Sequence, residues 1–197
     1  MKIEFVIPTY NRPNQLMGII SSIYSQTSPN WKIHVVADAV YDGYQKVKDY
    51  FIDDDRIKFT ELNGPHKDWG HTPRNYGLQH ATEEWVVMTG DDNYYMPVFV
   101  DDFLNSVDDK THFVYCNMIH NWTQQQYLHI NSIPKLGAID IGNFMSKTDL
   151  AKNIKLDTTN EQSDGLFVEE YLRKYPHGTI KKINNETTNK TRIRGLV

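Results

Sequence analysis

The sequence contains a single cysteine, Cys116, among its 197 residues. One cysteine excludes an internal disulfide framework and indicates a reducing compartment, so we expect a cytoplasmic, intracellular protein. No stretch approaches the roughly eighteen apolar residues that a membrane-spanning helix needs. The first residues also lack the positive-then-apolar pattern of a secretory signal peptide. We therefore expect no transmembrane segment.

An excess of positive charge is also absent, because the formal net charge is -4. The sequence has no basic stripe, and its basic tail is typical of a solvated chain end, so we expect no nucleic-acid partner. Internal repeats, low-complexity tracts and linkers are missing too. With 39% hydrophobic and 23% charged residues, a chain of this length is expected to form one globular domain, residues 1–197.

Short apolar runs alternate with segments of helical periodicity through the first part of the chain. The apolar runs predict strands at residues 3–8, 31–37, 56–62, 85–88 and 112–117. Between them, the spacing of apolar residues predicts helices that begin at residues 13, 43, 73 and 98. This order predicts an α/β fold in which helices flank a mostly parallel central sheet.

The alternation ends after residue 117, and a smaller C-terminal elaboration is expected there. Residues 127–130 suggest an edge hairpin, and residues 137–145 a short strand or loop. Ser146 is predicted to cap a helix that runs through Ile154. Either Ser163 or Asp164 is predicted to cap a further helix.

The apolar run Trp85–Met88 ends abruptly and is followed by two adjacent carboxylates, Asp91 and Asp92. Ligands of open α/β sheets bind beyond the carboxyl ends of the strands. Carboxylates on a loop suit Mg²⁺ or Mn²⁺ when phosphates complete the coordination of the ion. The stretch therefore predicts a metal-diphosphate site, while a solvated turn before a helix remains the alternative.

Three other polar side chains follow strands or begin helices. Asp38 ends the second predicted strand, where it can bind a ribose hydroxyl or a base N–H, or can simply form a turn. Arg74 falls in the first turn of a helix that Thr72 is expected to cap, and a cation there opposes the helix dipole unless an anion lies nearby. Asp164 is either a helix cap or a catalytic carboxylate, and the local pattern favours the cap.

Five motifs occur in a fixed order: Val6-Ile-Pro-Thr-Tyr-Asn-Arg-Pro13, the strand ending in Asp38, Arg74-Asn-Tyr-Gly-Leu78, Gly90-Asp-Asp-Asn93 with Pro97 behind it, and the late Asp164. This order resembles inverting, family 2 type glycosyltransferases of the GT-A fold. The resemblance covers about residues 1–175 and is closest to compact bacterial and large-virus members, which would place a viral chain in host cytoplasm. It implies one Rossmann-like nucleotide-binding domain, with a nucleotide-sugar half at 1–117 and an acceptor half at 118–197.

The resemblance also implies roles for donor-binding residues. Asp38 matches the residue that recognises the base, and Arg74 matches a cation near the nucleotide or diphosphate. The loop that holds the nucleotide corresponds to Pro8, Thr9, Tyr10 and Arg12.

For the reaction itself, the resemblance assigns Asp91 to the ribose and metal, Asp92 to direct metal ligation and Asp164 to deprotonation of the acceptor hydroxyl. This sequence departs from many members at Thr89, where they have an aspartate two positions before Asp91. Fewer carboxylates are then available, so water and phosphate oxygens must supply more of the ligands of Mn²⁺ or Mg²⁺. The departure puts the affinity for metal in doubt more than its use.

The expected function is therefore transfer of a sugar from a nucleoside diphosphate sugar, with UDP preferred by resemblance alone, to a hydroxyl of a glycan or glycoprotein. A metal-dependent nucleotidyltransferase is an alternative, although such enzymes usually carry a glycine-rich basic loop after the first strand, and residues 9–13 contain no glycine. A non-catalytic sugar- or nucleotide-binding module is the other alternative, because four tryptophans and twelve tyrosines could line a carbohydrate platform.

Overall fold

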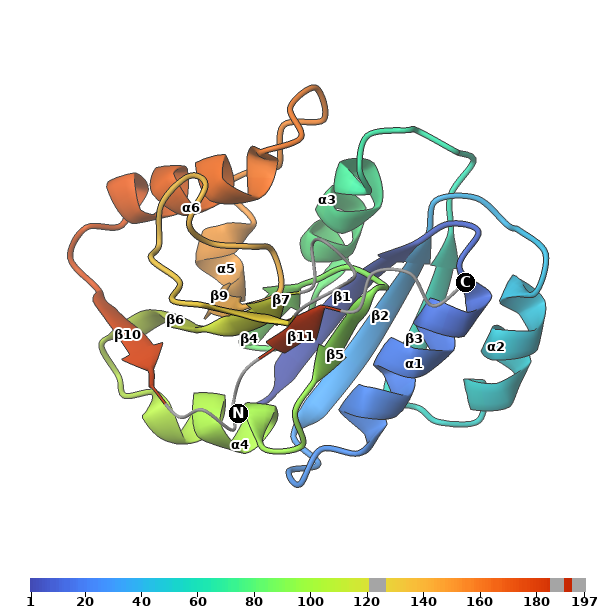
Figure 1. Ribbon diagram of the computed structural model, residues 1–197, viewed down its shortest axis with the longest axis horizontal. Helices are drawn as coiled ribbons and strands as arrows, with labels where there is room; N and C mark the ends of the chain where they lie inside the picture. The colour runs from blue at the N-terminus through green and yellow to red at the C-terminus, as the bar shows by residue number, and fades with distance from the viewer. Residues whose placement is uncertain (121–126, 185–189, 193–197) are drawn as a thin grey trace.

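A seven-stranded sheet in the order β10-β6-β9-β4-β1-β2-β3 forms the centre of the computed structural model, which describes residues 1–120, 127–184 and 190–192 (Figure 1). Neighbouring strands are parallel except β9, which is antiparallel to both β4 and β6. The strands are β1 (Ile3–Thr9), β2 (Trp31–Ala37), β3 (Ile57–Glu61), β4 (Trp85–Met88), β6 (Thr111–Cys116), β9 (Phe144–Lys147) and β10 (Thr179–Ile183). The predicted α/β class with a mostly parallel sheet is confirmed.

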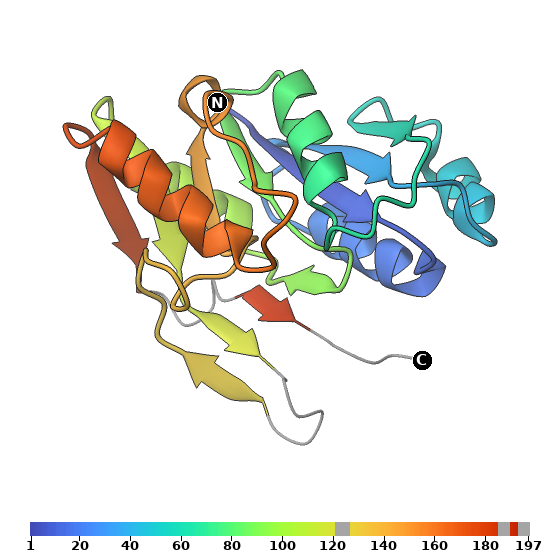
Figure 2. The same cartoon turned by 90° about the horizontal axis from the view of Figure 1, so that it is seen from above.

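Helices cover both faces of this sheet, as Figures 1 and 2 show. They are α1 (Pro13–Tyr24), α2 (Tyr44–Phe51), α3 (His71–His80), α4 (Phe99–Ser106), α5 (Thr148–Ala151) and α6 (Ser163–Lys174). Side chains of β1 alternate between the two cores: Phe5 packs with the core of α1, α2 and α4, whereas Val6 packs with that of α3, α5 and α6. Burial on both faces explains why β4 is apolar along its whole length.

A second, four-stranded sheet lies beside the first, in the order β5-β11-β7-β8. Its strands are β5 (Asn93–Tyr95), β7 (Met118–His120), β8 (Leu128–Ile130) and β11 (Lys190–Arg192). β8 is an edge strand and pairs antiparallel with β7, so the edge hairpin expected at 127–130 contributes a strand there. Figure 2 shows this pair extending away from the central sheet. None of the helices in the described part of the chain has the length and apolarity that crossing a membrane requires.

Three predicted helix starts are wrong. Gly70, in the left-handed conformation at φ 82°, is the N-cap of α3, and the backbone N–H of Thr72 donates to the Asp68 carboxylate instead (2.8 Å). Ser146 lies within β9, so α5 is a single turn that starts at Thr148.

The third wrong start concerns α6, whose N-cap is Gln162 rather than Ser163 or Asp164. The Ser163 hydroxyl instead accepts a hydrogen bond from the backbone N–H of Asp157, outside the helix. Asp164 therefore lies in the first turn of α6 and does not cap it.

Candidate active site

A cavity of about 470 Å³ lies beyond the carboxyl ends of the central strands. β1 ends at Thr9, β2 at Ala37 and β4 at Met88, so the loops that follow these strands meet at one edge of the sheet. All the predicted site residues line this cavity: Pro8, Thr9, Tyr10, Arg12, Asp38, Arg74, Asp91, Asp92 and Asp164. The structure therefore brings together every residue that the sequence proposed for donor, metal and base.

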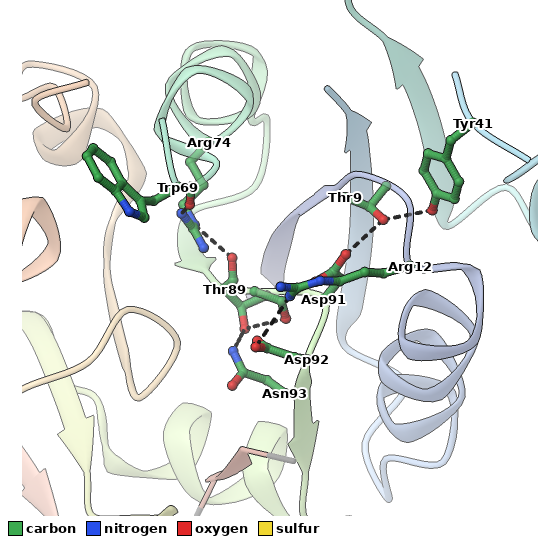
Figure 3. A network of polar contacts seen from close by, with 10 residues as sticks. Thr9, Arg12, Tyr41, Trp69, Arg74, Thr89, Asp91, Asp92 and Asn93 are labelled. Carbon is green, nitrogen blue, oxygen red and sulfur yellow. Dashed lines mark hydrogen bonds and ion pairs between the residues drawn. The ribbon is translucent and has the colours of Figure 1, made fainter. Parts of the chain in front are cut away.

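Thr9 and Arg12 both donate hydrogen bonds to the Asp91 carboxylate at this edge (Figure 3). The Thr9 hydroxyl donates to Asp91 Oδ2 at 2.9 Å, and Arg12 Nη1 donates to Asp91 Oδ1 at 3.2 Å. Tyr41, which the sequence analysis did not select, shares a hydrogen bond with the Thr9 hydroxyl at 2.8 Å. Burial raises the pKa of Asp91 to about 6, with Arg12 opposing that shift and the charge of Asp92 adding to it. A cation near this carboxylate would favour its ionised form.

The Asp92 carboxylate lies next to Asp91, and Arg12 Nη1 approaches its Oδ2 at 3.5 Å. Arg12 is exposed, so this ion pair is weak and the guanidinium is available to a phosphate. A Cβ atom at Gly90 would come within 2.8 Å of Asp92 Oδ1, so glycine is what allows the carboxylate to approach the backbone here.

These two carboxylates fit a metal ion that is shared with a ligand. The described residues contain no group of three or more His, Cys, Asp or Glu side chains arranged to hold a metal ion by themselves. Mg²⁺ typically binds to one or two protein carboxylates and takes its remaining ligands from phosphates and water. Asp91 and Asp92 provide that kind of partial ligand set.

Thr89 lies two positions before Asp91, and its oxygens are hydrogen-bonded. Its buried hydroxyl accepts hydrogen bonds from Asn93 Nδ2 (2.7 Å) and from the Tyr95 hydroxyl (2.8 Å). Its carbonyl accepts a hydrogen bond from Arg74 Nε at 2.8 Å. Thr89 thus holds the turn that carries Asp91 and Asp92, and its oxygens are engaged in that network.

Arg74 is almost fully buried, with 7% of the residue exposed. Besides Thr89, it donates from Nη1 to the Trp69 carbonyl at 2.8 Å. Burial lowers its pKa, but the negative charges around it oppose that shift: Asp92, Asp140, Asp164 and Asp91. These carboxylates explain why a cation is tolerated in the first turn of α3, where the helix dipole alone would disfavour it.

Asp38 lies under the loop of residues 63–71. Its Oδ2 accepts a hydrogen bond from the backbone N–H of His66 at 2.9 Å, and its Oδ1 contacts His66 Nδ1. Gly64 passes so close to the Asp38 carbonyl and carboxylate that a Cβ atom would clash with both. His66 therefore lies at the predicted base-recognition position. Its signals in the sequence were the histidine itself, typical of a surface or substrate contact, and the density of turn-forming residues in this loop.

Asp164 lies in the first turn of α6 and lines the cavity. Its pKa is raised, first by burial and then by the charge of Asp140, while the N–H of Gly165 and Arg74 oppose the shift. A raised pKa improves a carboxylate as a general base near neutral pH. Asp140 and Glu161 also line the cavity.

Comparison with known proteins identifies the family to which the chain belongs. The model of glycosyl transferase family 2 matches residues 4–175. A GalNAc(5)-diNAcBac-PP-undecaprenol beta-1,3-glucosyltransferase of Campylobacter jejuni is 34% identical over 93 residues, which are 47% of this chain and 30% of that protein. An uncharacterised glycosyltransferase of Haemophilus influenzae is 21% identical over 124 residues, 60% of this chain and 40% of the relative. The chain thus spans less than half the length of these curated relatives.

Solved structures show the same fold. A crystal structure of residues 1–349 of S. aureus TarS matches with a TM-score of 0.80 at 18% identity, over 98% of this chain and 60% of that chain. TarS has also been solved with UDP and with UDP-GlcNAc. The mannosyltransferase PcManGT from Pyrobaculum calidifontis, solved with GDP-Man and Mn²⁺, matches with a TM-score of 0.74 at 15% identity, over 99% and 57% of the two chains. The expected GT-A architecture is confirmed.

Proposed function

The chain belongs to glycosyl transferase family 2, and from that premise we propose that it is a metal-dependent, inverting glycosyltransferase. It moves a sugar from a nucleoside diphosphate sugar to a hydroxyl of a glycan or glycoprotein. The observation that carries this proposal is a single cavity with a nucleotide loop, two adjacent carboxylates, a buried arginine and a separate carboxylate, Asp164. Residues 1–117 supply the donor half, and residues 118–197 supply the acceptor half.

The donor is proposed to lie along the ends of β1, β2 and β4. Pro8, Thr9 and Tyr10 contact the nucleoside, and Asp38, held by His66, accepts a hydrogen bond from the base. UDP is the preferred nucleotide by family resemblance, and the UDP complexes of TarS agree with that preference. PcManGT was solved with GDP-Man, so GDP-linked sugars are the donors to compare with UDP-linked ones.

Asp92 and Asp91 are proposed to hold Mn²⁺ or Mg²⁺ together with the diphosphate. When bound, the ion would supply positive charge that stabilises the departing diphosphate. Arg12 and Arg74 add positive charge from the protein. Arg74 is fixed by its hydrogen bonds to the Thr89 and Trp69 carbonyls, so its position is set before the substrate binds.

Asp164 is proposed to be the general base. Its carboxylate takes the proton of the acceptor hydroxyl as the acceptor oxygen bonds to the anomeric carbon, and the bond from that carbon to the diphosphate oxygen breaks. The products are the glycosylated acceptor and a nucleoside diphosphate. Attack on the face opposite the leaving group inverts the configuration at the anomeric carbon.

Release of free nucleoside diphosphate tests this function directly. The protein is incubated with UDP-sugars and GDP-Man in the presence of Mn²⁺, and UDP, GDP and pyrophosphate are measured. We expect release of one nucleoside diphosphate, dependent on the metal. Pyrophosphate would instead identify a nucleotidyltransferase, and binding without release from any donor would identify a non-catalytic module.

A further inference from the structure

Trp69 differs from the other tryptophans whose environments are described. Its residue surface is 52% exposed, whereas Trp31 and Trp85 are 1% and 0% exposed and pack in the core. Trp69 lines the active-site cavity from the loop that precedes α3. Its backbone adopts φ 58°, an uncommon conformation for a residue with a side chain. A large, half-exposed aromatic ring thus lines the cavity of the proposed reaction.

The backbone of Trp69 is held on both sides. Its carbonyl accepts a hydrogen bond from Arg74 Nη1 at 2.8 Å. The preceding residue, Asp68, accepts from the N–H of Thr72 at 2.8 Å and so joins the loop to the first turn of α3. These contacts fix the loop from which the indole projects.

The indole lies on the acceptor side of the cavity. In Figure 3 it lies on the far side of Arg74 from Asp91 and Asp92, toward the segment that leads into α6. His71 connects the two segments, because its ring centroid is 6.0 Å from that of Trp69 and its Nε2 lies 3.1 Å from the Asn160 carbonyl. Trp69 therefore lies in the part of the cavity wall that leads to Asp164.

The charges on this side disfavour an anionic acceptor. Asp140, Glu161 and Asp164 all line it. Three cations line the described cavity: Arg12 and Arg74, which both interact with Asp91 and Asp92, and the exposed Lys67. Arg74 also interacts with Asp140 and Asp164, but one guanidinium does not balance the three carboxylates of Asp140, Glu161 and Asp164. A carboxylate or phosphate on the acceptor would face like charges, whereas neutral hydroxyl groups can donate hydrogen bonds to these carboxylates.

We propose that Trp69 is the platform on which a neutral sugar ring of the acceptor stacks, with the carboxylates of Asp140 and Glu161 binding its hydroxyl groups. The negative π face of the indole attracts the weakly positive C–H groups on the apolar face of a pyranose. This proposal rests on the glycosyltransferase function, and it names the acceptor class, a neutral carbohydrate, together with the residue that selects it.

The test compares Trp69→Ala, Trp69→Phe and a matched surface control, Tyr50→Ala, whose side chain is exposed on α2 outside the cavity. Methyl glucoside, methyl galactoside and methyl N-acetylglucosaminide serve as neutral acceptors, and methyl glucuronide as the anionic counterpart of methyl glucoside. Acceptor binding is followed by saturation-transfer NMR with UDP and Mn²⁺ present, and acceptor and donor KM are measured in transfer assays.

We expect Trp69→Ala to weaken binding of a neutral glycoside at least tenfold, while the UDP dissociation constant and donor KM stay within twofold of the parent values. Trp69→Phe should recover most of the loss because it keeps an aromatic face, and Tyr50→Ala should change nothing. Methyl glucuronide should bind at least tenfold more weakly than methyl glucoside.

Several results would overturn the platform. They are unchanged acceptor binding in Trp69→Ala, an equal loss of donor affinity, glucuronide binding as tight as glucoside binding, or no binding of any neutral glycoside. Failure of the transferase function is distinguishable, because glycosides that bind through Trp69 without any nucleoside diphosphate release would leave the platform standing and refute the transfer. Transfer that is unaffected by the Trp69 substitutions would refute the platform and leave the transferase function standing.

Discussion

Replacing Asp164 by Asn separates a catalytic role from a structural one. Asn has nearly the same shape and retains an oxygen that can accept the 2.8 Å hydrogen bond from the N–H of Gly165. Gln162 rather than Asp164 occupies the N-cap position of α6, so the substitution leaves the cap residue unchanged. What disappears is the ability of the side chain to accept a proton, together with one of the two oxygens that accept hydrogen bonds from the backbone N–H groups of Gly165 and Ile141.

Loss of a positioned general base typically lowers turnover by 10² to 10⁴, or about 3 to 5 kcal/mol in the activation barrier. We therefore expect Asp164→Asn to lose that factor in kcat while UDP affinity, measured by calorimetry, remains within about twofold. The donor should bind normally because Asp91, Asp92, Arg12 and Arg74 are unchanged.

Stability should move in the opposite direction from activity. The folded-state pKa of Asp164 is raised by burial and by Asp140. A carboxylate with a raised folded pKa favours folding below its unfolded pKa, and this contribution is lost as pH rises through the folded value. At neutral pH the ionised Asp164 therefore opposes folding, so Asp164→Asn should melt at the same temperature as the parent or higher. For the same reason, the acidic limb of the parent pH–rate profile should lie above the usual aspartate pKa, and the rate should rise with pH.

The assay combines UDP release, glycoside product and thermal unfolding for parent and variant. A variant that transfers sugar near the parent rate would refute the assignment of Asp164 as the base, and Glu161 or Asp140 would then be the next candidates. Glu169 is less suitable because its carboxylate accepts a hydrogen bond from the backbone N–H of Leu136 at 2.9 Å and it does not line the cavity. A large fall in melting temperature would refute the charge argument instead.

Three further predictions follow from the contacts of the site and of the core. Chelation should abolish transfer and Mn²⁺ or Mg²⁺ should restore it, whereas Asp92→Ala should resist rescue; full activity in excess chelator would contradict metal dependence. Asp38→Ala should weaken UDP binding by about one to two orders of magnitude, since a hydrogen bond to a charged group contributes roughly 1.5 to 3 kcal/mol. If calorimetry on the folded variant shows unchanged UDP affinity, the role of Asp38 is limited to holding His66. Gly77→Ala should lower the free energy of unfolding by about 1 to 3 kcal/mol, because its Cβ would overlap the Val6 side chain where α3 packs on β1. Urea titration measures this loss, and an unchanged free energy of unfolding would mean that the two elements shift apart without cost.

Five of the seven strands of the central sheet, and the edge at which the site forms, could be predicted from the sequence, whereas β9 and β10 could not. Apolar runs such as Trp85–Met88 stop where polar residues begin, and parallel strands place those stops at one edge of a sheet. Thr9, Asp38 and Asp91 are therefore brought together by strand order alone, although long stretches of chain separate them. The position of Arg74 in the first turn of a helix, where the helix dipole disfavours a cation, also indicated nearby anions, and four carboxylates interact with it.

Tertiary contacts decided what local patterns could not. Ser146 resembles a helix cap, but it pairs in β9, which enters the sheet antiparallel between β4 and β6 and so depends on two strands distant in sequence. Thr72 and Ser163 also resemble caps, yet their polar groups bind Asp68 and the backbone of Asp157 instead. The approach of Asp140 to Asp164 and the exposure of Trp69 likewise depend on how the loops of residues 63–71 and 157–162 fold over the sheet edge. These features arise from long-range packing and charge, and for that reason a periodicity of two or 3.6 residues carries no information about them.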